Sequence, residues 1–142
     1  MIQKFLLLFI FCKILTCISN DLYAQAPNKM QYQAIVRNSA GQAFSYYIVR
    51  VRTSILQGTS SGVSSYTETQ LTNTDANGLI KIEIGAGTVV SGSLNSINWA
   101  NGPYFIKTEI DPNGGINYTI SSISQLLSTP YASVAKTSSL TS

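Results

Sequence analysis

Alternating apolar and polar residues along several short segments predict strands rather than helices. Over residues 47–56, Val49 and Val51 alternate with Arg50 and Arg52. Successive side chains of a strand point to opposite faces, so one face of this segment is apolar and the other is charged. That division is typical of an antiparallel strand with one face in the core and the other in water.

The strongest alternation follows a turn. Ile80, Ile82 and Ile84 face one way, whereas Lys81 and Glu83 face the other. Further segments with strand character, separated by turns rich in Gly, Asn, Asp and Ser, cover residues 31–37, 66–71, 104–110 and 116–127, the last with room for one or two strands. About seven short strands and no sustained helical period predict an all-β fold, a single antiparallel β-sandwich.

Residues 85–103 are expected to form a long connection with one helical turn over residues 94–99. The connection begins with Gly85 and Gly87, a G-x-G that also occurs in dinucleotide-binding loops. Such a loop needs a third glycine where Val90 stands, and it needs a βαβ unit around it. We therefore expect these glycines to end a strand and to let the chain bend.

The N-terminus has the three parts of a secretory signal peptide. Lys4 supplies a positive charge, an apolar run extends from Phe5 to Cys12, and small residues surround Ala24. The run is shorter than the roughly 20 apolar residues of a transmembrane helix, and no later segment is apolar enough to span a membrane. We expect cleavage after Ala24, which gives a secreted or cell-surface protein that begins at Gln25.

Cleavage removes both cysteines. Cys12 and Cys17 lie within the signal peptide, so the mature chain has no thiol, disulfide or soft metal ligand. The triplet ILT before Cys17 weakly resembles a bacterial lipidation box, which makes a lipid anchor at Cys17 the alternative to simple secretion. Of nine basic and six acidic residues, Lys4, Lys13 and Asp21 leave with the signal, so seven basic and five acidic residues remain. This weak positive charge argues against nucleic-acid binding.

The expected organisation is a signal peptide at residues 1–24, a β-sandwich domain at residues 25–128 and an exit or linker tail at residues 129–142. Without its first 24 residues the 142-residue chain keeps 118, which suits one compact domain.

The stretch "NTDANGLIKIEIG" resembles a calcium loop at its start. Asn73, Asp75, Asn77 and Gly78 occupy the first, third, fifth and sixth places of such a loop. The twelfth place, which needs a bidentate acid, is Ile84, and the pattern that follows the loop is that of a strand rather than a helix. A metal site is therefore not expected. We expect a hairpin turn at "DANG", with positive φ at Asn77 and Gly78.

Catalytic groups are few. The mature chain has no histidine and no cysteine, and no base is evident that would activate a serine. Its carboxylates are Glu68, Asp75, Glu83, Glu109 and Asp111. Glu83 and Glu109 would suit a glycoside hydrolase if they lay across a sheet from one another in a cleft. Their neighbours Lys81 and Lys107 favour charge pairs on an exposed strand face instead, so no catalytic residue and no cofactor are expected.

Aromatic residues are the remaining candidates for a binding site. Tyr46 and Tyr47 are adjacent in the expected strand, so both cannot face the core, and they are the expected exposed pair. Trp99 lies in a loop, where it would either stack on a sugar or close one end of the sandwich. We favour closure, with Tyr104 and Tyr118 in the core, because large aromatic residues are usually buried.

Five segments carry a resemblance to a known family: "AQAPNKMQYQAIVRNSAGQ", "VRTSILQG", "TDANGLIKIEIGAGTVVSG", "INWANGPYFIKTEIDPNGG" and "QLLSTPYASVAK". Together they resemble the N-terminal module of uncharacterised secreted proteins of the Bacteroidetes, over nearly all of the mature chain. The resemblance implies an immunoglobulin- or transthyretin-like sandwich that precedes collagen-like repeats, tail-fibre-like segments or other cell-surface domains. It implies no catalytic residues.

The sequence departs from that family pattern near its end. Relatives continue beyond the exit stretch, whereas this sequence stops at Ser142, and Ser133 stands where a bulkier residue is common. We therefore expect either a piece of a longer protein or a module that acts alone.

Three functions follow as hypotheses. The first is a non-enzymatic structural or assembly module that forms the base or spacer of a surface fibre and contacts other surface-protein domains or further copies of itself. The second is a glycan- or protein-binding adhesin domain that uses Tyr46, Tyr47 and Trp99. The third is a secreted hydrolase that uses Glu83 and Glu109.

Overall fold

The computed structural model describes Gln3 and residues 29–127. Apart from Gln3, the expected signal peptide lies outside these residues, and so do Cys17 and the expected tail at residues 129–142. Among the residues described, no helix has both the length and the apolar character needed to cross a bilayer.

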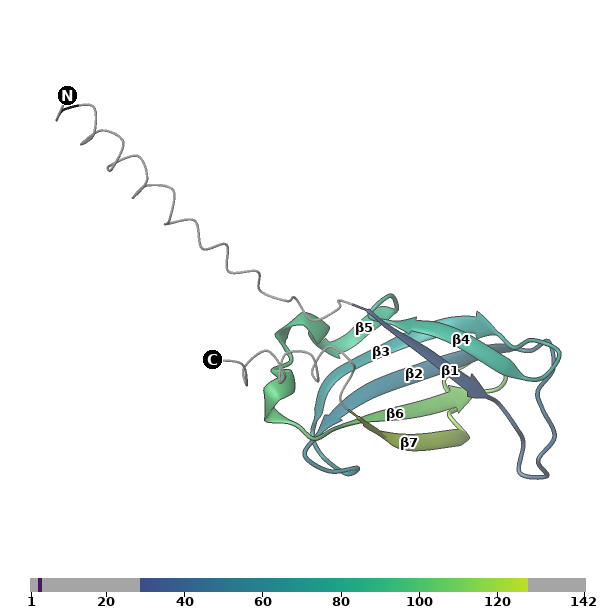
Figure 1. Ribbon diagram of the computed structural model, residues 1–142. Helices are drawn as coiled ribbons and strands as arrows, with labels where there is room; N and C mark the ends of the chain where they lie inside the picture. The colour runs from purple at the N-terminus through teal and green to yellow at the C-terminus, as the bar shows by residue number, and fades with distance from the viewer. Residues whose placement is uncertain (1–2, 4–28, 128–142) are drawn as a thin grey trace.

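Seven strands form two antiparallel sheets that face each other (Figure 1). The strands are β1 (Met30–Ile35), β2 (Ile48–Gln57), β3 (Ser64–Asn73), β4 (Leu79–Ile84), β5 (Thr88–Gly92), β6 (Tyr104–Asp111) and β7 (Ile120–Leu126). Five of them form one sheet in the order β5-β3-β2-β6-β7, and β1 pairs with β4 in the other. The all-β fold predicted from the sequence is confirmed, and the arrangement is that of a β-sandwich.

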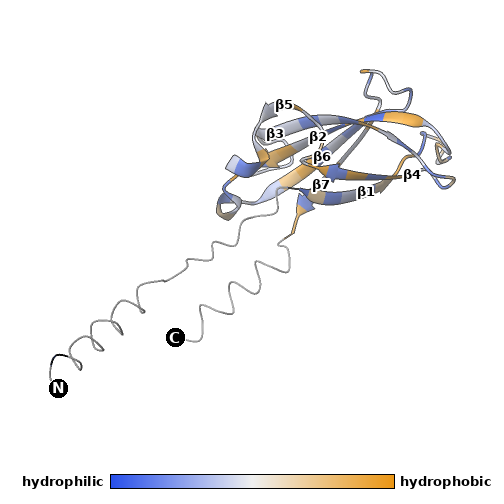
Figure 2. Cartoon of the chain, turned by 90° about the horizontal axis from the view of Figure 1, so that it is seen from above, coloured by the Kyte–Doolittle hydropathy of each residue, from blue (hydrophilic) through white to orange (hydrophobic). Residues whose placement is uncertain are grey.

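The core lies between the sheets because each strand turns its apolar face inward. Ile80, Ile82 and Ile84 of β4 are buried, and they pack with Val49 and Val51 of β2. Burial of an aliphatic side chain of this size stabilises the fold by roughly 1.5 to 3 kcal/mol. Figure 2 shows the resulting bands of apolar and polar residues along the strands.

The prediction of a hairpin between β3 and β4 is wrong. The two strands belong to different sheets, and the turn Asp75–Gly78 carries the chain from one sheet to the other. The N–H of Gly78 donates to the carbonyl of Asp75 (3.0 Å), while Leu79 both accepts from the Asp75 N–H (3.0 Å) and donates to Asp75 Oδ1 (2.9 Å). Gly78 has φ of 77°, but Asn77 does not have the positive φ that was predicted.

Two further predictions need correction. Tyr46 and Tyr47 do not lie in a strand, because β2 begins at Ile48 and the tyrosines belong to the turn before it. The connection predicted after Gly85 contains an additional strand, β5, which pairs with the edge of β3. The helical turn expected within that connection is present as two short 3-10 turns, η1 (Leu94–Ser96) and η2 (Trp99–Asn101).

The two ends of the sandwich differ in what they contain. We call one the loop end, formed by residues 36–47, 74–78 and 112–119. The other is the terminal end, where β1 begins at Met30 and β7 finishes at Leu126 (Figure 1). The described chain therefore enters and leaves the sandwich at the same end.

Candidate functional site

Tyr46 and Tyr47 lie at the loop end, where backbone bonds fix their turn. The N–H of Tyr46 donates to the carbonyl of Asp75 (3.2 Å), and the N–H of Tyr47 donates to Thr74 Oγ1 (2.8 Å). Tyr46 is 78% exposed and has φ of 62°, the single non-glycine residue of the described chain with a positive φ. Tyr47 is 47% exposed and its ring meets Phe44 edge to face. The predicted exposure of both tyrosines is confirmed.

Trp99 lies at the terminal end and is half-buried. Its ring packs against that of Tyr104, with centroids 5.1 Å apart at 64°. The Tyr104 hydroxyl donates to the carbonyl of Asn98 (2.8 Å), one residue before Trp99. Trp99 therefore closes this end of the core, as an end plug would.

The structure does not bring the three predicted aromatic residues together. Tyr47 immediately precedes β2, whereas Tyr104, the partner of Trp99, pairs with Gln57 at the far end of that ten-residue strand. A strand of ten residues spans roughly 33 Å. Tyr46 and Tyr47 can form one surface, and Trp99 cannot be part of it. Tyr118, which was expected in the core, is only half-buried.

Glu83 and Glu109 lie in different sheets, so the arrangement across one sheet that a hydrolase pair was expected to use does not exist. Glu83 belongs to β4 and accepts a bond from Lys29 Nζ (3.2 Å), not from its sequence neighbour Lys81. The Glu83 carboxylate is thus engaged by a lysine that precedes β1.

Glu109 is the centre of a charged cluster on the outer face of the five-stranded sheet. Arg52 Nε donates to its Oε2 (2.8 Å), and Lys107 Nζ lies 3.1 Å from its Oε1. The hydrogen bond from Arg52, helped by Lys107, holds the pKa of the Glu109 carboxyl below its ordinary value despite partial burial. The Arg52 guanidinium lies 4.1 Å from the centre of the Tyr118 ring. The charge pair expected between Glu109 and Lys107 is confirmed.

Sequence reasoning did not single out Glu68. The structure shows that its side chain is fully buried. Its Oε2 accepts from the Tyr66 hydroxyl (2.6 Å) and from the N–H groups of Gly85 (2.9 Å) and Gly87 (3.2 Å). Its Oε1 accepts from Gln70 Nε2 (2.7 Å). The signal was present in the alternation, because Glu68 shares the inward face of β3 with Tyr66 and Gln70.

The surroundings of Glu68 also perturb its neighbour. Burial, together with the hydrogen bond to the Glu68 carboxylate, raises the pKa of the Tyr66 hydroxyl well above its ordinary value. Tyr66 therefore remains a proton donor throughout the ordinary pH range. The arrangement fixes the β4–β5 turn on β3, and every buried side-chain polar atom among the described residues has a hydrogen-bond partner.

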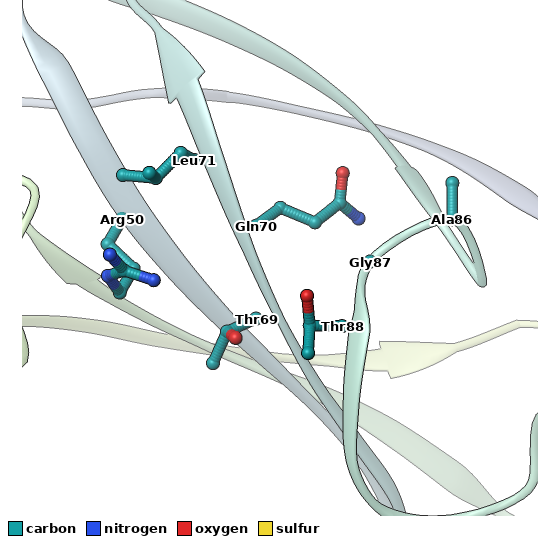
Figure 3. A pocket seen from close by; sticks show the side chains of 7 residues that line it. All are labelled: Arg50, Thr69, Gln70, Leu71, Ala86, Gly87 and Thr88. Carbon is teal, nitrogen blue, oxygen red and sulfur yellow. The ribbon is translucent and has the colours of Figure 1, made fainter.

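One shallow hollow of about 300 Å³ lies beside that turn (Figure 3). It is lined by Arg50, Thr69, Gln70, Leu71, Ala86, Gly87 and Thr88. In the close-up the Gln70 amide points toward Ala86 and Gly87, and this amide donates to the carbonyl of Glu83 (2.8 Å). Arg50 Nε donates to the carbonyl of Gly114 (3.1 Å). The hollow thus contains one guanidinium and two threonine hydroxyls, but no carboxylate that could act as a base.

A second hollow of about 250 Å³ lies near the terminal end. Its lining consists of Lys29, Tyr66, Gly85, Val89, Gly92, Ser93, Leu94 and Asn95. Lys29 is already paired with Glu83, and Tyr66 is already bonded to Glu68.

The acidic residue of the former calcium-loop candidate, Asp75, has a structural role. Asp75 Oδ1 accepts from the N–H groups of Asn77 (2.8 Å) and Leu79 (2.9 Å), which caps the turn. Asp111 has a similar role in the turn after β6, where it accepts from the N–H groups of Asn113 (2.9 Å) and Asn117 (2.8 Å). Within the described residues, no three side chains of His, Cys, Asp or Glu gather as metal ligands.

Comparison with protein-family models, with curated proteins and with solved structures found no match for this chain.

Proposed function

We propose that this chain is a non-enzymatic structural or assembly module of a secreted or cell-surface protein, the base or the spacer of a surface fibre. The observation that best supports this proposal is that the acidic side chains bond to other parts of the fold. Every carboxylate among residues 29–127 bonds to the fold: Glu68, Asp75, Glu83, Glu109 and Asp111. A catalytic acid or base must also be within reach of a substrate proton, and neither of the two hollows described above has a carboxylate in its lining. The N-terminal segment and the family resemblance support export to the surface.

Export is tested first with the full chain in a bacterial host. The expected product is a mature protein outside the cytoplasm that N-terminal sequencing shows to begin at Gln25. Phe9→Asp is the matched control, because a charge in the apolar run should keep the chain inside the cell. A wild-type chain that stays uncleaved in the cytoplasm would overturn the proposal.

The mass of residues 25–142 in solution separates the two forms of the proposal. A fibre base should give a defined oligomer, for example a trimer near three times the chain mass, at all concentrations tested. A spacer should be a monomer. Light scattering during size exclusion provides the measurement, and a mass that drifts with concentration would contradict both forms.

A binding module is the second candidate, and the turn before β2 favours it. Tyr46 adopts a conformation that costs a non-glycine residue roughly 1 to 2 kcal/mol, and its side chain nevertheless points into solvent. Ile48 and Leu71 are exposed nearby on the same end of the sandwich. Non-glycine residues with a backbone conformation of this kind cluster at active sites and ligand clamps, which makes this turn a candidate binding surface.

Tyr46→Gly tests this candidate because it removes the ring and relieves the backbone strain together. The free energy of unfolding should stay within about 1 kcal/mol of wild type, since the relief offsets the entropy cost of glycine. Binding to any glycan found in an array screen should fall at least tenfold. Retention of full affinity in Tyr46→Gly would dismiss the tyrosine surface.

A further inference from the structure

The two-stranded sheet has a free edge along β1. In an antiparallel pair, residues alternate between those whose backbone groups bond to the partner and those whose groups point away. Leu79 lies opposite Ile35, and both its N–H and its carbonyl form hydrogen bonds with Asp75. Leu79 and Ile35 are therefore not a hydrogen-bonded pair. The backbone groups of Gln31, Gln33 and Ile35 therefore point away from β4. No described residue pairs with them.

The five-stranded sheet extends beyond that edge. Tyr32 of β1 packs over β6, where its hydroxyl accepts from Thr108 Oγ1 (3.0 Å), and β7 lies one strand further out (Figure 1). Ser122 and Ser124 have the inward register of β7, yet both are exposed because no strand of the smaller sheet covers them. β1 and β7 thus form a step, with the edge of β1 as its wall and β7 as its floor.

The shape of this step selects a single strand as its occupant. If a second copy paired through its own β1, its β6 would lie beneath that strand, in the space that β7 of the first copy already fills. One extended segment about 4.8 Å from β1 has no such conflict. β1 also lacks the charges and prolines that commonly protect a free edge from pairing.

We propose that residues 131–136 of the same chain, "YASVAK", form a third strand beside β1 and parallel to it. β7 finishes at Leu126 at the terminal end, where β1 begins, so residues 127–130 can bridge the roughly 10 Å between the sheets. Six residues match the six of β1, and they contain one charge, at the end of the segment. A tethered segment has an effective concentration near the millimolar range, which favours it over the same segment of another copy.

This strand would change where the chain leaves the domain. A segment parallel to β1 finishes at the loop end, so the chain would enter at one end of the sandwich and leave at the other. The strand itself does not depend on the proposed function, but this exit suits a spacer in a linear array.

Amide hydrogen exchange of residues 25–142, resolved by residue, tests the proposal. The amides of Gln31, Gln33 and Ile35 should exchange slowly, because the added strand accepts from them. Tyr32 and Ala34, which bond to β4 in either case, are the internal control.

Proline variants assign the protection to the tail. Ser133→Pro and Val134→Pro are made separately, because neighbouring residues of a strand point their N–H groups in opposite directions and only one is needed by the ladder. In at least one of them the three edge amides should exchange at least about tenfold faster, while Tyr32 and Ala34 do not change. Thr141→Pro is the matched control and should leave all five amides as in wild type.

Three results would overturn the proposal. Fast exchange of the edge amides in the wild-type chain would show that the edge is bare. Protection that survives both proline variants would assign it to another segment. Protection seen only in a dimer, and lost in the monomer on dilution, would assign the strand to a second copy.

Discussion

At the scale of single residues, the clearest feature is a carboxylate used as part of the core. Glu68 receives four hydrogen bonds, two of them from backbone N–H groups of the β4–β5 turn. A buried charge is tolerated only when such partners replace the water it has lost. The residue therefore determines how the turn sits on β3.

Glu68→Gln should lower the free energy of unfolding by about 2 to 3 kcal/mol. The amide NH₂ group that replaces one carboxylate oxygen would face hydrogen-bond donors, and neither it nor those donors would have an acceptor. Equilibrium unfolding in urea gives this value. Glu83→Gln is the matched control, since its partner Lys29 is exposed and such pairs contribute about 0.5 kcal/mol or less. Equal losses in the two variants would contradict the role assigned to Glu68.

The lowered pKa of Glu109 predicts a dependence of stability on pH. Because the folded carboxyl has a lower pKa than the unfolded one, the unfolded chain binds the proton first as the pH falls. The contribution of Glu109 is therefore complete above the ordinary glutamate pKa of about 4.3 and is lost as the pH falls through the lowered value. Between about pH 5 and pH 2, the Glu109→Gln variant should lose less of its free energy of unfolding than the wild-type protein loses. An unchanged acid slope would contradict the prediction.

At the scale of elements, the β4–β5 turn requires glycine for reasons of space. A Cβ added at Gly87 would lie 2.6 Å from Gln70 Cγ and 2.8 Å from the carbonyl oxygen of Thr69. The carbonyl belongs to the β3 backbone and cannot move away as the end of a side chain can. The glycine that sequence reasoning expected to end a strand thus also allows the backbone to approach Glu68.

Gly87→Ala should destabilise the protein by about 1 to 3 kcal/mol, the usual cost of an added methyl group in a packed site. The midpoint of thermal unfolding should fall accordingly. Ala86→Ser, at the exposed neighbouring position of the same turn, should change stability by no more than about 0.5 kcal/mol. A neutral Gly87→Ala would show that the turn can move away from β3.

At the scale of the whole molecule, the two ends of the sandwich have different roles. Trp99 closes the terminal end against Tyr104, whereas the loop end exposes Tyr46 and Tyr47. Sequence reasoning grouped these three aromatic residues as one candidate site. They are separated by the length of β2, which no local pattern reveals.

Trp99→Ala should lower the free energy of unfolding by about 2 to 3 kcal/mol, somewhat less than for a fully buried tryptophan. A thermal or urea transition measures the loss. Val63→Ala, at an exposed loop position of the same end, is the control and should change stability by about 0.5 kcal/mol or less. A stable Trp99→Ala protein would return Trp99 to the list of binding candidates.

Local patterns along the chain were enough to assign the class of fold and the faces of its strands. Ile80, Ile82 and Ile84 could be assigned to one face because period two is a property of the chain over a few residues. The exposure of Tyr46 and Tyr47 followed correctly, although the strand assigned to them was wrong. The bond between Lys107 and Glu109 could also be expected, since residues two apart share a face.

The pairing of the strands could not be predicted from these local patterns. The turn after Asp75 was expected to close a hairpin, but β3 and β4 lie in opposite sheets, because Leu79 turns its backbone toward Asp75 and β4 then pairs with β1. Glu68 became a core residue for the same reason, since its donors Gly85 and Gly87 reach it only when the sheets face each other. Pairing joins residues far apart in the chain, and the local alternation of side chains is the same whichever partner a strand finds.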